Sequence, residues 1–256
     1  PAYDRQGVSL DDLVDFTPRV RQMAVDAVDG YRLGPLFTPP TRPVEGGVQG
    51  TLMRPPDNGA AGWAGAALDP VTGMLYVPSR NNAVVIPLYA PDAAQGASVP
   101  FTHGAPEAER LARAREGRRA GPQMPQGLPL VKPPYSRITA IDMNTGNHEW
   151  MVPLGDGDRY RNHPLLRELN LPPLGDGVIN GPLLTSTLLI TALTTGSSND
   201  GPRLVAYDKN SGEILGAVDL PAGAIGTPMT YMVDDKQYIA LTVGGSPPKL
   251  IALQLP

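Results

Sequence analysis

The sequence predicts an all-β fold built from short antiparallel sheets, with helices confined to insertions. The chain has 29 glycines and 30 prolines among 256 residues, a composition typical of many turns and few long helices. From residue 51 onward, short apolar runs alternate with turn residues, as strands and hairpins do. Two of these runs share one strand–turn–strand pattern, which indicates a repeated unit.

Composition excludes several classes of function. The net charge of −4 gives no electrostatic reason to expect a nucleic-acid partner. Cysteine is absent, so disulfide, zinc–thiolate and thiol-nucleophile chemistry are impossible. The absence of cysteine is compatible with an oxidising compartment. No apolar run reaches the length that spans a bilayer. The chain begins at Pro1, so we expect a processed or truncated product with targeting information upstream.

The first part of the chain, residues 1–50, is predicted to be a helical and loop insertion. Residues 9–30 are predicted to be helical, because Thr17 can cap a helix that has Pro18 at its first position. Apolar residues then fall on one helical face at Val20, Met23, Ala24, Ala27 and Val28. Residues 33–49 are rich in proline and glycine and are predicted to be an extended loop.

Short strands dominate the rest of the chain. They are predicted at Trp63–Leu68, Met74–Val77, Arg137–Asp142, His148–Leu154, Gly181–Leu184, Leu188–Leu193, Arg203–Asp208, Glu213–Leu220, Thr227–Val233, Tyr238–Val243 and Lys249–Leu255. Asp234 and Asp235 form the tight turn of one hairpin. Residues 91–134 are predicted to be a surface insertion with a short basic helix at 107–119, and residues 156–176 a second insertion.

The repeat is the strongest internal signal. Ala140–Gly146 (AIDMNTG) parallels Ala206–Gly212 (AYDKNSG). In each copy a strand ends in an aspartate, whose carboxylate can accept backbone N–H groups in the turn. Each turn ends in a glycine, which tolerates a positive φ. A hairpin that recurs with four strands per unit is typical of a β-propeller blade.

Counting strands gives about three blades, at residues 63–154, 181–220 and 226–256. The third shows only three strands, so we expect its outer strand to come from elsewhere in the full protein. Propellers have about four to eight blades, so three blades cannot close a ring. Their exposed sheet edges would favour association.

Several segments resemble the quinoprotein dehydrogenases that use pyrroloquinoline quinone (PQQ), especially the membrane glucose dehydrogenase branch. The similar segments are Gly34–Pro40, Gly50–Leu52, Gly62–Gly65, Arg137–Asp142 with Trp150, Leu220–Gly223, Gly226–Tyr231, Lys236–Tyr238 and Val243–Gly245. They cover nearly the whole chain apart from residues 91–134. The combination of Leu220–Gly223 with Gly226–Tyr231 (LPAG, GTPMTY) is the most specific match.

The resemblance implies an eight-bladed propeller with PQQ on its axis beside Ca²⁺. Residues 1–256 would be the C-terminal part of this one PQQ-binding domain, and the remaining blades would be partners. Such enzymes oxidise a small-molecule alcohol or aldose sugar and pass the electrons to a membrane quinone or cytochrome. The resemblance also implies a periplasmic location, with any attachment to the inner membrane made by upstream sequence.

The resemblance places the catalytic aspartate, most calcium ligands and a PQQ-contacting lysine upstream of this chain. No catalytic or metal-binding residue is therefore assigned here, and the chain is expected to be inactive alone. Two rival hypotheses are a non-enzymatic propeller scaffold and a catalytically inactive paralogue. Glucose is in doubt as the substrate, because Ser246-Pro-Pro follows Gly245 where glucose-oxidising relatives carry a histidine.

The cofactor contacts implied by the resemblance are Asp57, Asn58, Trp63, Asn180 and Gly181. The family has a PQQ-contacting asparagine six residues before its equivalent of Trp63. That position is Asp57 here, and a shift of one residue would place the amide of Asn58 there. An aspartate facing an anionic cofactor is unfavourable without a cation or a proton. As alternatives, Trp63 would be a core indole, and Asp57 and Asn58 would be ordinary turn residues.

Other polar and aromatic residues are predicted to have structural roles. Trp150 is interpreted as a wedge between blades, whereas the second repeat has Gly216 where a tryptophan is expected. Asp142 and Asp208 are interpreted as turn caps. A final set is predicted to lie on the surface or in loops, without metal ligation: His103, His148, His163, Asp156, Asp158 and Asp176.

Overall fold

The computed structural model describes residues 1–91, 99–103, 121–193 and 201–254 and divides the chain into two compact units. The blade unit consists of Pro1–Asp4, Ala60–Asn81 and Pro133–Pro256. The extension unit consists of Arg5–Gly59 and Asn82–Lys132. The two units are described separately below.

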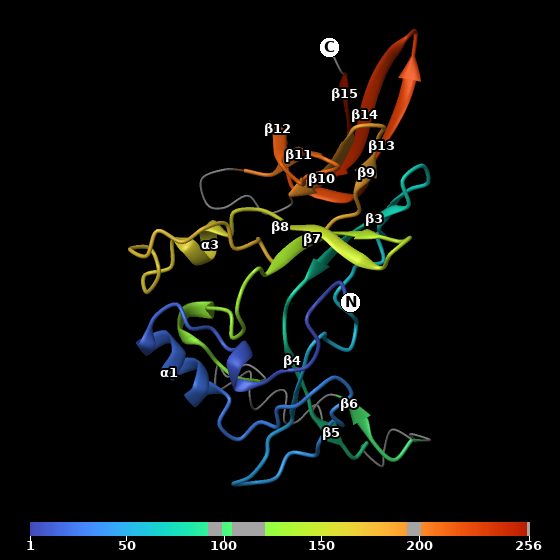
Figure 1. Cartoon of the computed structure of the whole chain (residues 1–256). Helices are drawn as coiled ribbons and strands as arrows, with labels where there is room; N and C mark the ends of the chain where they lie inside the picture. The colour runs from blue at the N-terminus through green and yellow to red at the C-terminus, as the bar shows by residue number, and fades with distance from the viewer. Residues whose placement is uncertain (92–98, 104–120, 194–200, 255–256) are drawn as a thin grey trace. The chain divides into compact units, whose positions relative to one another are not determined.

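The blade unit contains three antiparallel sheets (Figure 1), in the orders β2-β3-β7-β8, β9-β10-β11-β12 and β13-β14-β15. The strands are β2 (Ala67–Asp69), β3 (Met74–Arg80), β7 (Ser136–Asp142), β8 (Asn147–Pro153), β9 (Leu183–Leu184), β10 (Leu188–Leu193), β11 (Arg203–Asp208), β12 (Ile214–Asp219), β13 (Ala224–Val233), β14 (Lys236–Val243) and β15 (Lys249–Gln254). Each sheet is a meander in chain order. The predicted all-β class, a partial propeller, is thereby confirmed.

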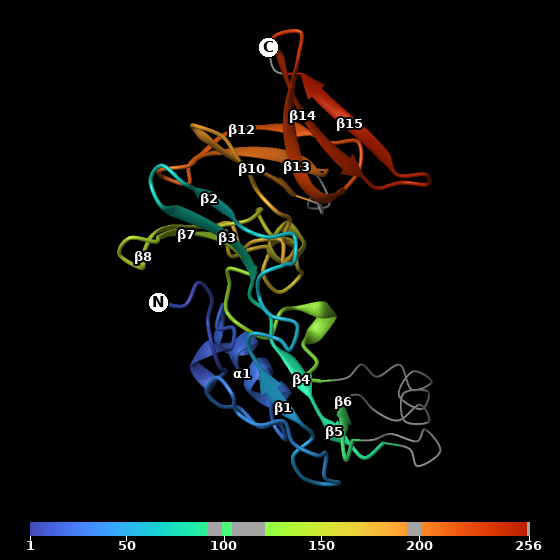
Figure 2. The same ribbon diagram turned by 90° about the vertical axis from the view of Figure 1, so that its right-hand side faces the viewer.

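The three sheets converge at their first strands. β2 contacts β9, and β9 contacts β13, so the opening strands of successive sheets lie against one another. Figure 2 shows the first, second and third sheets of the blade unit one above another, from bottom to top. Because each meander then runs away from this side, the sheets fan out as propeller blades do.

Apolar side chains fill the spaces between neighbouring sheets. Successive side chains of β10 point to opposite faces of the middle sheet, so this strand contributes to both cores. Leu189 faces the first sheet, and Ile190 faces the third. The first core is formed by Ala67, Tyr76, Ile138, Ala140, Leu154, Leu189, Val205 and Tyr207. The second is formed by Ile190, Ala192, Leu204, Leu220, Ala224, Ile239, Leu241 and Val243. A middle blade buried on both faces explains its continuous apolar runs.

The repeated turns have the predicted geometry. The Asp142 carboxylate accepts the backbone N–H of Asn144 at 2.8 Å, and the Asp208 carboxylate accepts that of Asn210 at 2.7 Å. Gly146 and Gly212 have φ values of 76° and 74°, where a side chain would be strained. Both aspartates are therefore confirmed as turn caps.

Two local predictions were wrong. The strand expected to begin at Trp63 begins at Ala67, because the preceding residues form a tight turn. His163 was expected on the surface, but it is only 6% exposed. The chain folds back around its ring, and Nδ1 of His163 accepts the backbone N–H of Leu165 at 3.1 Å. This turn lies just beyond the short helix α3 (Asp158–Arg161).

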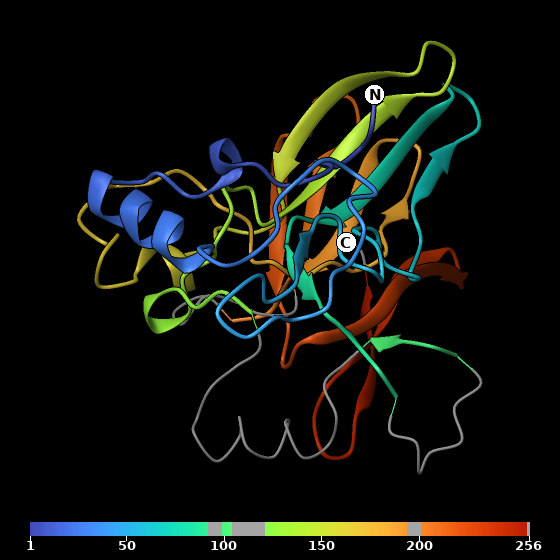
Figure 3. The ribbon, with the colours of Figure 1, turned by 90° about the horizontal axis from the view of Figure 1, so that it is seen from below.

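The extension unit has one ten-residue helix, α1 (Pro18–Ala27), visible in blue in Figure 3. The Thr17 hydroxyl accepts the N–H of Val20 at 3.1 Å, which confirms the predicted cap. Residues 10–12 form only a single 3₁₀ turn, η1 (Leu10–Asp12), so the helical prediction for residues 9–30 was too long. The other elements are β1 (Thr51–Met53), β4 (Val84–Ile86), β5 (Leu88–Tyr89), β6 (Thr102–His103) and η3 (Pro125–Gly127).

Two segments predicted as separate insertions fold together in the extension unit. Leu13 and Val131 form an antiparallel bridge, and the N–H of Val14 donates to the carbonyl of Leu130 at 3.0 Å. Leu13 and Val131 are both buried, so apolar burial joins segments more than a hundred residues apart in the chain. The basic helix predicted at 107–119 lies outside the described residues.

Candidate functional site

Trp63 lies at the corner of a tight turn in the blade unit. The N–H of Gly65 donates to the carbonyl of Gly62 at 3.1 Å, and Gly65 has a φ of 89°, a conformation that favours glycine. The Trp63 side chain is 98% exposed. The interpretation of Trp63 as a core indole is therefore wrong. A fully exposed tryptophan is unusual in a folded protein, because tryptophan side chains are highly buried on average.

Three segments meet beside this turn, and we call them the axial cluster: Gly62–Gly65, Ile179–Gly181 and Thr227. A Cβ atom built on Gly181 would lie 2.0 Å from Oγ1 of Thr227 and 2.5 Å from the carbonyl oxygen of Ala64. The Thr227 hydroxyl donates to that same oxygen at 3.2 Å. The first two segments precede β2 and β9, and Thr227 lies in β13, so the cluster lies where the three sheets converge.

Asn180 is buried and holds a fixed position in the cluster. Its side-chain nitrogen donates to the carbonyl of Ala192, in β10, at 2.7 Å. This bond ties the segment before β9 to its own sheet and uses one of the amide's donors. Asn180 and Gly181 therefore lie beside the Trp63 turn, which Gly181 approaches at the carbonyl of Ala64. A cofactor contact by Asn180 or Gly181 stays a prediction.

Asp57 and Asn58 lie in the extension unit, at the two central positions of a turn. The N–H of Gly59 donates to the carbonyl of Pro56 at 2.8 Å, and Gly59 has a φ of 80°. Both side chains are exposed. The turn predicted as the alternative is thus present, and a cofactor contact by either residue stays a prediction.

In the axial cluster, Trp63 offers a surface for the flat part of a planar quinone, because its exposed indole presents an aromatic face. The side-chain positions of Gly62 and Gly181 are already filled, by Ile179 at the first and by Thr227 and Ala64 at the second. None of the predicted contact residues is basic, so the counter-charge for an anionic cofactor must come from other groups. Among the described residues, no cluster of three or more His, Asp or Glu side chains could hold a metal ion.

Thr227 is a site residue that the sequence reasoning missed. It lies within the Gly226–Tyr231 segment that carried the resemblance, but its sequence position gave no sign of a contact with Ala64, 163 residues away. A register shift in the pairing of β13 with β14 falls between Ile225 and Met229. Such a bulge redirects side chains at the edge of a sheet, and here it accompanies the contact of Thr227 with Gly181.

Asp176 differs from the turn-capping aspartates Asp142 and Asp208 in its burial and its pKa. Asp176 is buried, and one of its oxygens accepts the N–H of Gly157 at 2.8 Å. Burial raises the pKa of Asp176 to about 6, with Asp156 and Asp158 adding to the effect. Asp176 closes the neck of the loop that carries α3, where the N–H of Leu174 also donates to Asp156 O at 3.0 Å. Asp176 is a loop acid, as predicted, but it is buried.

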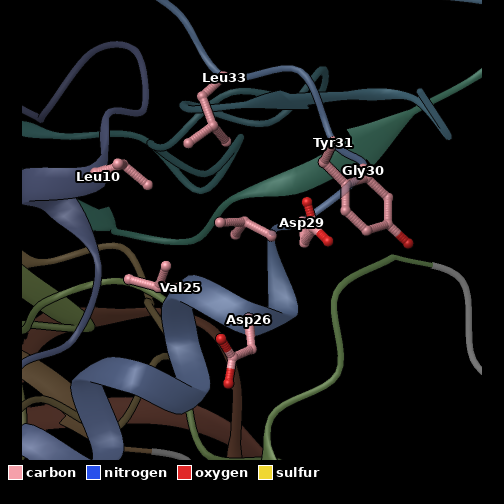
Figure 4. Close-up of a pocket in the computed structure, with 8 residues that line it drawn as sticks. Leu10, Val25, Asp26, Asp29, Gly30, Tyr31 and Leu33 are labelled. Atoms are coloured by element: carbon pink, nitrogen blue, oxygen red, sulfur yellow. The ribbon is translucent and has the colours of Figure 1, made fainter. Parts of the chain in front are cut away.

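The extension unit contains a separate open cavity of about 680 Å³ at the end of α1 (Figure 4). It is lined by Leu10, Val25, Asp26, Val28, Asp29, Gly30, Tyr31 and Leu33. Asp26 and Asp29 lie at the C-terminal end of the helix, whose dipole is also negative there. The charge of this cavity is unfavourable for an anionic cofactor, and none of the predicted contact residues lines it.

Comparison with known proteins identifies one family. The sequence model of the PQQ family, described as the β-propeller domain of glucose/ethanol/alcohol dehydrogenases, matches residues 1–239. The quinoprotein glucose dehydrogenase of Escherichia coli K12 is 28% identical over 225 residues, covering 82% of this chain and 26% of the relative. The quinate/shikimate dehydrogenase (quinone) of Acinetobacter baylyi is 36% identical over 123 residues, 47% of this chain and 14% of the relative.

Comparison with solved structures finds partial matches. The crystal structure of a quinohemoprotein alcohol dehydrogenase from Comamonas testosteroni matches with a TM-score of 0.45 and 23% identity. The match covers 75% of this chain and 23% of that chain. This chain thus spans about a quarter of the length of the glucose dehydrogenase and of the solved alcohol dehydrogenase.

Proposed function

Because this chain belongs to the PQQ family of dehydrogenase β-propeller domains, we propose that it forms the C-terminal part of a PQQ-dependent dehydrogenase. The proposed reaction oxidises an alcohol or an aldose sugar and passes two electrons to a quinone or another respiratory acceptor. The observation that supports it most directly is the axial cluster, where a fully exposed Trp63 lies on a tight turn at the convergence of three blades.

Within this proposal, each predicted residue has a limited role. Trp63 offers an aromatic face against which a planar ring stacks. Asn180 and Gly181 are proposed to lie beside that ring, in a segment that the bond from the Asn180 amide nitrogen to Ala192 holds in place. A cofactor contact by Asp57 or Asn58 stays a prediction of the resemblance. PQQ, when bound beside Ca²⁺, would supply the quinone that accepts the electrons.

The rest of the propeller is proposed to come from polypeptide outside this chain. The outward face of the third sheet is apolar, with Ile225, Met229 and Leu250 exposed, the last at 76%. Within the described residues, β15 pairs on one edge only. An apolar face next to an open strand edge favours association. A neighbouring blade and a fourth strand would cover both features, and they would also bring the catalytic aspartate and the calcium ligands.

The electron acceptor and the cellular location are also proposals. A relative whose name specifies a quinone supports a quinone acceptor. We propose a periplasmic location, with any anchor in the inner membrane supplied by sequence outside this chain. None of the described helices is both long enough and apolar enough to cross a bilayer.

The proposal is tested on the longest natural polypeptide that contains these residues, reconstituted with PQQ and Ca²⁺. PQQ binding and dye reduction are measured with a panel of alcohols and aldoses. We expect the Trp63→Ala variant to bind PQQ about tenfold more weakly, from the loss of one aromatic contact. Phe37→Ala is the matched control, because Phe37 is also an exposed aromatic residue but lies in the extension unit.

Two results would contradict the proposed enzymatic function. Wild-type protein that binds no quinone would favour a propeller scaffold without a cofactor. Protein that binds PQQ but turns over no alcohol or sugar would favour an inactive paralogue.

A further inference from the structure

The exposed indole of Trp63 has no packing of its own to fix it, so its position depends on the turn that carries it. Gly62–Gly65 is a single turn closed by one backbone hydrogen bond of 3.1 Å. A turn of this size is held in place only where other elements contact it. The contacts around it therefore decide whether the indole keeps one position.

Two neighbouring segments hold this turn. On one side, a Cβ atom on Gly62 would lie 3.2 Å from Cδ1 of Ile179, so the turn rests on the segment before β9. On the other side, the Thr227 hydroxyl donates to the carbonyl of Ala64, the residue next to Trp63, at 3.2 Å. This hydroxyl is the polar contact by which the third sheet holds the turn.

Gly181 makes that contact possible. The space that a side chain at residue 181 would need is occupied by Oγ1 of Thr227, at 2.0 Å, and by the carbonyl oxygen of Ala64, at 2.5 Å. A methyl group there would separate the hydroxyl from the carbonyl, since real Cβ atoms do not approach so closely. Gly181 thus brings the first and third sheets into contact across the second.

We propose that Thr227 is a positioning residue for Trp63, and that Gly181 allows it to act. Through its hydrogen bond to Ala64, Thr227 holds the turn so that the indole keeps one orientation at the convergence of the blades. This inference rests on the proposed function for its link to the cofactor. The bracing of the turn itself is independent of any cofactor.

The test compares Thr227→Val, which keeps the shape and loses the donor, with Thr227→Ser, which keeps the donor. Both are made in the longest natural polypeptide that contains the chain, labelled with 5-fluorotryptophan. The Trp63→Phe variant identifies the Trp63 resonance in the fluorine spectrum, and Trp150 serves as an internal reference. PQQ affinity and thermal stability are measured on the same samples.

We expect Thr227→Val to shift or broaden the Trp63 resonance, to leave that of Trp150 unchanged, and to weaken PQQ binding about fivefold, the effect of one hydrogen bond. Thr227→Ser is expected to restore both values. The melting temperature is expected to change little, because Thr227 is exposed and its hydrogen bond is not buried.

Gly181→Ala is expected to disturb the Trp63 resonance more strongly than Thr227→Val, since it displaces both partners of the contact. Gly216→Ala is its matched control, because no atom lies within 4 Å of a Cβ at Gly216. Equal effects of the two alanine substitutions on the Trp63 resonance would contradict the role of Gly181.

Three outcomes would overturn the role of Thr227. They are an unchanged Trp63 resonance in Thr227→Val, equal changes of both tryptophan resonances with a lower melting temperature, and a Trp63 resonance in Thr227→Ser that differs from wild type as much as in Thr227→Val. A shifted Trp63 resonance with unchanged PQQ affinity would uphold the bracing of the turn and reject its link to the cofactor. If the wild-type protein binds no PQQ, the proposed function fails, and the fluorine spectrum alone still decides whether Thr227 holds the turn.

Discussion

The indole N–H of Trp150, in β8 of the first sheet, donates to the carbonyl of Lys209, in the β11–β12 turn of the second sheet, at 3.2 Å. The same indole lies over Gly212, where a Cβ atom would come within 2.7 Å of its Cε3. Trp150 therefore joins neighbouring blades, as the resemblance implied. In the second sheet Gly216 pairs with Ala206, as Trp150 pairs with Ala140 in the first. Gly216 therefore occupies the position equivalent to Trp150, which confirms that the second sheet lacks this tryptophan.

Replacing Trp150 should weaken the joint between the first two blades. We expect Trp150→Ala to lower the free energy of unfolding by about 3 kcal/mol, because it leaves a cavity against Tyr76 and Gly212. Trp150→Phe should cost less, about 1 kcal/mol for the lost hydrogen bond in addition to a smaller packing loss. Urea denaturation followed by circular dichroism measures both. Equal stability of Trp150→Ala and wild type would contradict the wedge.

The two repeat glycines allow backbone strain and steric clash to be separated. Gly146→Ala introduces strain alone, since its φ is 76° and no atom lies within 4 Å of a Cβ there. We expect a loss of about 1 kcal/mol in unfolding free energy. Gly212→Ala adds a clash with Trp150 and should lose about 2 kcal/mol more. In the Trp150→Ala background the difference should shrink but not disappear, because Val152 Cγ1 would still lie 2.9 Å from the new Cβ atom. Chemical denaturation of the four variants measures this.

The ion pair between Asp69 and Lys209 should make stability depend on acid pH. Lys209 Nζ lies 2.7 Å from the Asp69 carboxylate, and this hydrogen bond lowers the pKa of Asp69 from 3.8 to about 2. A lowered pKa in the folded state means that the stabilisation is present above about pH 4 and is lost as the pH falls toward 2. Asp69→Asn should therefore flatten the stability profile in this window.

Carbon NMR titration of Asp69 measures the same interaction directly. In Lys209→Met the pKa of Asp69 should rise toward 3.8, since the main hydrogen-bond donor is gone. It should stay slightly below that value, because the N–H of Val71 still donates to the carboxylate at 3.0 Å. A pKa that does not move in Lys209→Met would show that the two side chains do not pair in solution.

Asp176 should affect the pH dependence of stability in the direction opposite to Asp69. Burial raises its pKa to about 6, so the folded protein favours the protonated form, and the contribution of Asp176 to stability falls as the pH rises from about 4 through 6. Asp176→Asn resembles the protonated form and keeps an acceptor for Gly157. We expect this variant to be more stable than wild type at pH 7.5 by about 1 kcal/mol, less than the full pKa shift would give in a site that water partly reaches.

The comparison at low pH provides the control for Asp176. Near pH 4 wild-type Asp176 is protonated, so the unfolding curves of the variant and the wild type should coincide. A variant that is less stable than wild type at pH 7.5 would show that the carboxylate is charged and paired in the fold.

The sequence by itself determined the features that depend on neighbours along the chain. Alternating apolar residues place the strands to within a few residues, Asp142 and Asp208 cap turns that their glycines complete, and Thr17 caps α1. These are local effects, because a turn or a cap is satisfied within a few residues. The resemblance added the family, which the comparisons confirm.

Only the tertiary structure decided the contacts between distant segments. Trp63 was placed in a strand and weighed as a core residue, but its exposure follows from the turn that Gly65 closes and that Thr227 holds from 163 residues away. His163 and Asp176 are buried because their loop folds back on itself, and Leu13 meets Val131 because both need apolar cover. Burial and close approach depend on which segments share a space, and neighbours in the sequence carry no record of that.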